Sequence, residues 1–261
     1  MKLSISNIGW KQPQDQQVYE LMKKYGFCGL EIAPTRICPE NPYDHLETIK
    51  EWKKTLKETY GFEVPSMQSI WFGRTENMFR SEDERKTLLN YTKKAIDFAS
   101  VIGCKNLVFG CPRNRNLPEG ADKKIAVEFF KELGAYAAEK KTVIGMEANP
   151  PIYNTNYIND TRSALELVRE VASEGFLLNL DVGTMIQNEE TLEELQGQVP
   201  LFNHVHISEP GLKMIEERSL HTELAQLLKK ENYQKYVSIE MGAQEDWHVI
   251  EKCMAYVSHM F

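Results

Sequence analysis

The sequence predicts a single-domain α/β protein in which residues 1–261 form one (β/α)8 barrel. Short runs rich in Val, Ile and Leu alternate along the chain with amphipathic stretches whose apolar residues recur every three or four positions, the helical period. A length of 261 residues suits one such barrel. No Pro- or Ser-rich linker divides the chain, so a single domain is expected.

The predicted elements follow one another as strand and helix along the whole sequence. The expected strands cover residues 3–8, 29–32, 64–69, 106–110, 143–147, 176–181, 202–207 and 236–240. The expected helices cover residues 15–25, 45–60, 82–102, 121–140, 161–172, 189–197, 221–230 and 247–261. Gly26, Gly61 and Gly103 stand where a helix should give way to a strand. An open doubly wound sheet would favour a glycine-rich loop after the first strand, and residues 7–12 form no such loop.

Composition excludes several classes of protein. The net charge is −7, which argues against a general nucleic-acid binder because such proteins need a basic face for phosphates. No run of about 20 apolar residues predicts a membrane span, and the N-terminus carries no targeting pattern. The five cysteines show no C-x-x-C spacing and read as reduced thiols of a cytoplasmic protein.

Four potential metal ligands stand at the ends of the last four predicted strands: Glu147, Asp181, His206 and Glu240. The carboxyl ends of barrel strands meet at one rim, so these side chains should converge. Carboxylates brought together repel one another, and a divalent cation removes that cost. Three oxygen donors and one nitrogen predict one divalent metal ion, with Mn²⁺, Mg²⁺ or Co²⁺ preferred and Zn²⁺ possible.

The segments around these residues resemble the xylose isomerase-like TIM barrel superfamily, also called the sugar phosphate isomerase/epimerase family. The resemblance is carried by residues 145–150, 180–184, 204–210 and 238–241, and more weakly by residues 29–32. In the ketose 3-epimerases of this superfamily, matching Glu, Asp, His and Glu residues hold one divalent metal. The resemblance therefore implies that Glu147 and Glu240 are both metal ligands and the catalytic acid and base. It also implies a homo-oligomer, since members often form dimers or tetramers.

The resemblance implies a metal-dependent isomerase or epimerase that acts on a small sugar, sugar phosphate or polyol. The reaction would move a proton beside a carbonyl through a metal-stabilised enediolate. One alternative is a metal-dependent dehydratase of a keto-polyol or dehydroshikimate-like acid. A non-catalytic sugar-binding barrel is less favoured, because the four-ligand set is intact. A nuclease similar to endonuclease IV is also less favoured, because the third and fourth strands end without histidine.

Further residues near the predicted rim are candidates to contact the substrate. Aromatic walls and polar groups suit a sugar, and arginine suits phosphate or carboxylate. The substrate-binding candidates are Trp10, Glu31, Trp71, Arg74, Glu209 and His221. Arg113 and Arg115 follow the fourth strand and could bind an anionic group or simply face solvent. Two departures from the family stand out: Thr184 replaces a histidine common in the epimerases, and no Lys-x-Asp element follows His206.

Overall fold

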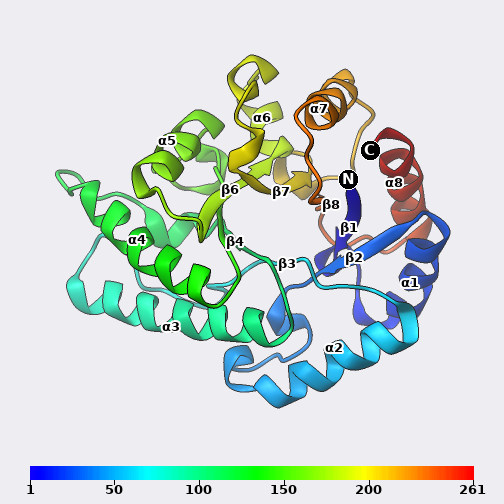
Figure 1. The fold of residues 1–261 in the computed structure, drawn as a ribbon, viewed down its shortest axis with the longest axis horizontal. Coiled ribbons are helices and arrows are strands. Elements are labelled where there is room, and N and C mark those ends of the chain that lie inside the picture. Colours follow the sequence, from blue (N-terminus) through cyan, green and yellow to red (C-terminus); the bar gives the residue numbers. More distant parts are fainter.

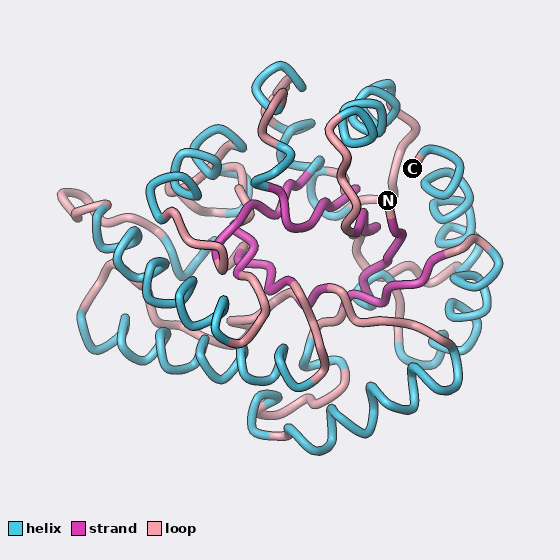
Figure 2. Tube along the Cα trace, in the orientation of Figure 1, coloured by secondary structure: helices cyan, strands magenta, loops and turns pink.

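The computed structural model describes residues 1–261 and forms a ring of parallel strands surrounded by helices (Figures 1 and 2). The strands are β1 (Lys2–Ser6), β2 (Phe27–Glu31), β3 (Ser66–Met67), β4 (Asn106–Phe109), β5 (Ile144–Met146), β6 (Phe176–Asp181), β7 (Phe202–Ile207) and β8 (Tyr236–Ile239). The helices are α1 (Asp15–Lys24), α2 (Leu46–Tyr60), α3 (Glu82–Val101), α4 (Lys124–Glu139), α5 (Thr161–Val171), α6 (Val182–Gln187), α7 (Ser219–Lys230) and α8 (Trp247–Met260). The predicted single-domain (β/α)8 barrel is confirmed.

The strands form one eight-stranded parallel sheet in the order β2-β1-β8-β7-β6-β5-β4-β3. The ring closes between β2 and β3, where two isolated bridges pair Gly29 with Glu63 and Ile32 with Met67. Backbone hydrogen bonds from Leu30 to Glu63 (2.8 Å) and from Gln68 to Ile32 (2.9 Å) reinforce this closure. All strands therefore deliver their carboxyl ends to the same mouth of the barrel.

The sixth helix differs from the prediction. The sequence suggested residues 189–197, but α6 occupies Val182–Gln187 and begins directly after β6. The reason is a local cap: the Asp181 carboxylate accepts a hydrogen bond from the Thr184 amide at 2.8 Å, which starts the helix without a loop. Within the expected segment, Leu192–Leu195 forms only a short 3-10 turn. The position of α6 matters because Asp181 also faces the mouth of the barrel.

Apolar packing lies between the sheet and the helices, whereas much of the barrel interior is polar. A single cluster of 66 buried apolar residues makes the core. Inside the ring, the Asn106 side-chain amide donates to Ser66 Oγ (3.0 Å) and Asn179 Oδ1 (3.1 Å). A Cβ on Gly145 would lie 2.5 Å from Asn106 Oδ1, so a larger residue here would displace the Asn106 side chain. None of the helices is both long and apolar enough to cross a membrane.

Candidate metal centre

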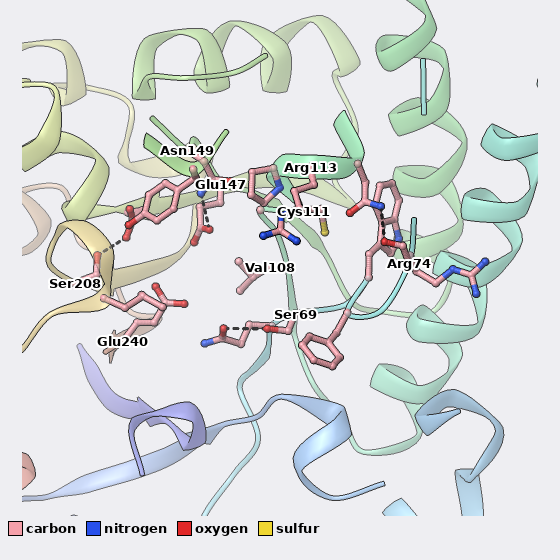
Figure 3. Close-up of a pocket in the computed structure, with 18 of the residues that line it drawn as sticks. Ser69, Arg74, Val108, Cys111, Arg113, Glu147, Asn149, Ser208 and Glu240 are labelled. Carbon is pink, nitrogen blue, oxygen red and sulfur yellow. Dashed lines mark hydrogen bonds between the residues drawn. The ribbon is translucent and has the colours of Figure 1, made fainter. Parts of the chain in front are cut away.

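The four predicted ligands come together at the mouth of the barrel. Asp181 is the last residue of β6, and His206 is the second-last residue of β7. Glu147 and Glu240 directly follow β5 and β8. One ligand atom from each of the four lies within 4.8 Å of the others. Three of them, the carboxylates of Glu147, Asp181 and Glu240, line a cavity of about 610 Å³ (Figure 3). That volume is ordinary for a small-molecule site, which typically encloses roughly 300–1,000 Å³.

His206 lies at the floor of the cluster with its two ring nitrogens facing different partners. Its Nδ1 is 3.0 Å from Glu147 Oε1 and 3.3 Å from Glu240 Oε2. Its Nε2 is 3.0 Å from Glu31 Oε2, on the side away from the cavity. A proton on Nε2 can therefore be donated to Glu31, so Nδ1 is the nitrogen that could bind a cation placed among the carboxylates.

Asp181 is oriented by groups that use both of its carboxylate oxygens. The Ser208 hydroxyl donates to Oδ1, and the Thr184 amide donates to Oδ2 at 2.8 Å. The Thr184 hydroxyl lies 2.7 Å from the same Oδ2. Thr184 is buried and does not line the cavity. Thr184 therefore supports Asp181 in this chain.

The concentration of carboxylates shifts the protonation of the cluster in the absence of metal. Burial, the largest effect, and the neighbouring negative charges of Glu147 and Asp181 raise the pKa of Glu240 to about 7. Burial and the charge of Glu147 also raise the pKa of Asp181. Burial opposes protonation of His206, but the charges of Glu31 and Glu240 outweigh it and hold its pKa well above the usual value. Metal-free, the cluster thus retains protons that a cation would displace.

The donor set fits a divalent metal ion. Three carboxylates supply hard oxygen donors, and His206 supplies one nitrogen whose partner nitrogen is already engaged by Glu31. No thiol belongs to the cluster. Oxygen-rich sites of this kind suit Mn²⁺, Mg²⁺ or Co²⁺, and the imidazole also permits Zn²⁺.

Glu31 was expected to contact substrate, and the structure corrects this expectation. Its side chain is fully buried and does not line the cavity. The Oε2 atom lies 3.0 Å from His206 Nε2 and 3.1 Å from His204 Nε2, while Oε1 accepts from the Gln68 amide at 3.1 Å. Glu31 therefore contacts both histidines of β7 and the Gln68 amide directly. Glu31 instead holds the ring of His206, the candidate nitrogen ligand.

Replacing Glu31 with glutamine is expected to weaken metal binding about 10- to 100-fold, the usual effect of removing an outer partner of a metal-bound histidine. The amide is a weaker acceptor than the carboxylate and no longer favours the proton on His206 Nε2. Isothermal titration of the metal-free protein with Mn²⁺ measures the affinity. Glu166→Gln, at an exposed position of α5, is the matched control. Equal affinity in the Glu31 variant and the wild type would contradict the assignment.

Three of the other predicted contacts lie in the cavity wall: Trp71, Arg74 and Glu209. The Trp71 indole donates to Thr92 Oγ1 at 2.8 Å, so its ring is fixed. Arg74 forms an ion pair with Glu76, and its side chain turns away from the acidic cluster in Figure 3. Glu209 receives two hydrogen bonds from Arg218, at 2.7 and 2.6 Å. Each of these polar groups is already engaged by another part of the chain.

Trp10 and His221 do not line the cavity, which corrects the expectation that they contact substrate. Trp10 is buried and its indole donates to Asp15 Oδ1 at 2.7 Å. His221 is buried in α7, with Nδ1 3.0 Å from the Tyr256 hydroxyl. Burial lowers the pKa of His221 to about 4, so the ring is neutral. Both residues stabilise the shell of helices and loops around the barrel.

Several residues at the site were not predicted. Asn149 Nδ2 donates to Glu147 Oε2 at 3.2 Å, and Asn179 Nδ2 donates to Glu147 Oε1 at 2.9 Å. Arg115, expected near the rim or in solvent, is fully buried and donates to the Glu147 carbonyl at 2.8 Å and to Asn149 Oδ1 at 2.9 Å. Asn179 could have been found, because it precedes Asp181 by two residues and so shares its face of β6. The role of Arg115 depends on tertiary contacts that no local pattern indicates.

A (β/α)8 barrel with an acidic, histidine-containing cluster at the carboxyl ends of β5 to β8 defines the class of protein. The sequence matches the family described as xylose isomerase-like TIM barrel over residues 19–252. The chain belongs to this family. A search of curated proteins found no match.

Solved structures with the same fold include several sugar epimerases. The 3-keto-D-glucoside 4-epimerase YcjR from E. coli is 21% identical, with a TM-score of 0.78 and 99% of both chains covered. The D-psicose 3-epimerase from Clostridium cellulolyticum H10, solved with D-tagatose, is 16% identical, with a TM-score of 0.78 over 99% of this chain and 97% of that one. The IOLI protein, solved with a zinc atom, is 20% identical, with a TM-score of 0.73 over 100% of this chain and 99% of that one.

Proposed function

We propose that the protein is a divalent-metal-dependent isomerase or epimerase of a small sugar, sugar phosphate or related polyol. The observation that carries this proposal is the convergence of Glu147 and Glu240 on one imidazole nitrogen of His206 at the wall of a 610 Å³ cavity. Two carboxylates beside a cation site can remove a proton next to a carbonyl and return one. Membership of the xylose isomerase-like family and the sugar epimerases among its structural neighbours support the same reaction class.

The ion, proposed as Mn²⁺, Mg²⁺ or Co²⁺ with Zn²⁺ as a further candidate, would be held by Glu147, Asp181, His206 and Glu240. When bound, it supplies positive charge that stabilises a developing negative charge on the substrate oxygens. Asp181 is fixed by Ser208 and Thr184 and serves only as a ligand. His206 is fixed by Glu31. These two residues provide the rigid part of the site.

Glu147 and Glu240 are proposed to move the protons. Hydrogen bonds from Asn179 and Asn149 at separate oxygens hold the Glu147 carboxylate in place, and Arg115 fixes its main chain. Glu240, 3.3 Å from His206 Nδ1, lines the same cavity and is proposed as the second group that transfers a proton. Trp71 and Val108 add apolar surface to the same cavity.

Incubation of the Mn²⁺-loaded protein with ketohexoses in D₂O tests the proposal. D-fructose, D-psicose, D-tagatose and D-sorbose are the probes. We expect a new isomer and solvent deuterium at the carbon that exchanged its proton, detected by NMR and mass spectrometry, because the abstracted proton passes through a carboxylate in contact with solvent. Protein stripped with chelator is the control and should show neither. Loss of water with a new conjugated absorbance would contradict the proposal and favour the dehydratase.

A further inference from the structure

Arg113 is a cation in the cavity wall that makes no hydrogen bond or ion pair with the protein. Arg74, the other arginine in the wall, is paired with Glu76. Arg218, which reaches the wall through Glu209, is paired with that residue. Figure 3 shows the Arg113 side chain directed into the cavity between Glu147 and Ser69. Its five donors are therefore available to a ligand.

The backbone that carries Arg113 is anchored on both sides. Before it, Cys111 lines the cavity with φ of 45°, and its carbonyl accepts a hydrogen bond from the Asn114 amide at 3.1 Å. After it, the Asn114 side chain donates to the carbonyls of Arg74 (3.1 Å) and Glu76 (2.8 Å). Arg115 is fully buried and donates to the Glu147 carbonyl. Arg113 is thus the exposed residue of a segment whose neighbours are held by the loop after β3 and by Glu147.

The charges in the cavity are separated. The three carboxylates of Glu147, Asp181 and Glu240 exceed the charge of one divalent ion, so the ligand cluster remains negative when loaded. Arg113 carries the positive charge that no protein group neutralises. A ligand with an anionic end is therefore oriented with that end toward Arg113 and its carbonyl end toward the cluster. Guanidinium binds carboxylate and phosphate with paired, charge-assisted hydrogen bonds.

We propose that Arg113 forms an oxyanion subsite, which binds a carboxylate or phosphate at the end of the substrate remote from the reacting carbonyl. This inference rests on the proposed function, which assigns the carbonyl end of the substrate to the acidic cluster. It narrows the substrate to an anionic sugar: a ketose phosphate or a keto-sugar acid. A neutral ketose would leave the guanidinium to water.

Three ligands that differ only at C6 test the subsite: D-fructose, D-fructuronate and D-fructose 6-phosphate, with CH₂OH, carboxylate and phosphate respectively. Inorganic phosphate and acetate are added as probes that need no sugar site. Isothermal titration is performed on the Mn²⁺-loaded wild type, on Arg113→Met and on Arg162→Met. Arg162 lies on α5, is exposed and pairs with Glu166, so it is a matched control outside the cavity.

We expect at least one anionic sugar to bind about 10-fold or more tightly than fructose, and Arg113→Met to remove this preference while fructose affinity stays unchanged. Whichever of D-fructuronate and D-fructose 6-phosphate binds more tightly shows whether the subsite prefers carboxylate or phosphate. Equal affinity for all three sugars, or a preference that survives Arg113→Met, would overturn the subsite and leave the proposed function standing. If no sugar binds but phosphate or acetate binds in an Arg113-dependent way, the subsite stands and the proposed ketose function fails. If no probe binds, both are overturned.

Discussion

Replacement of Glu240 by glutamine should abolish turnover, with a loss in kcat of about 10³-fold or more. The amide keeps the size of the side chain and one oxygen for the ion, but it cannot accept or return a proton. Glu240 is 3.3 Å from His206 Nδ1 and lines the cavity, so it is placed to exchange a proton with a ligand bound there. Steady-state rates with a ketose that the wild type converts provide the measurement. Glu147→Gln should act in the same way.

The control for this prediction is Glu245→Gln. Glu245 lies in the loop after β8, is exposed and pairs with Lys11, so its loss should leave the rate unchanged. Metal content and circular dichroism must be recorded for every variant, because Glu240 is also a proposed ligand. A Glu240→Gln protein that is folded, holds its ion and turns over at the wild-type rate would exclude Glu240 as acid or base.

Substitution of His206 by alanine is expected to remove most of the metal affinity, by more than the 10- to 100-fold loss typical of outer partners. The imidazole is the single nitrogen donor of the cluster, and its Nδ1 contacts both Glu147 and Glu240. Without it, Glu31 is also left buried without its 3.0 Å partner. Metal content per chain after reloading with Mn²⁺, Mg²⁺, Co²⁺ or Zn²⁺ gives the readout, and His259→Ala on α8 is the control.

Asp181→Asn provides a second test of the ion site if the alanine variant fails to fold. Asparagine can still cap α6 through its side-chain oxygen, but it brings no charge to the ion. The wild type should hold one ion per chain, and the Asp181 variant should lose it. Unchanged stoichiometry in both variants would show that the ion, if bound, lies elsewhere. Three zinc ions per wild-type chain would revive the nuclease alternative.

Barrel geometry explains why part of the site could be predicted from sequence. Parallel strands of a closed sheet present their carboxyl ends at one mouth, so a strand-end residue has a predictable place. Glu147, Asp181, His206 and Glu240 converge for that reason. The same reasoning placed Glu31 at the mouth, but it could not tell the depth of the side chain. Strand stagger and the contacts with His204 and His206 set that depth.

Loop and helix residues were less predictable because their partners are tertiary. His221 reaches Tyr256 on another helix, and the amide of Asn114 reaches the carbonyls of a different loop. The start of α6 was missed because a single carboxylate, that of Asp181, replaces the usual loop between strand and helix. These contacts can be identified only when the three-dimensional positions of the strands and loops are known.

Asp181 has two roles, as the cap of α6 and as a candidate ligand of the ion. Its Oδ2 accepts the Thr184 amide that opens α6, while the same carboxylate faces the ion site. An ion held by Asp181 would withdraw electron density from this helix cap, and it would tie β6 to the neighbouring strands that carry the other candidate ligands. The rate of amide hydrogen exchange in the first turn of α6 would then depend on whether the ion is bound, and it can be measured in the intact protein without substrate.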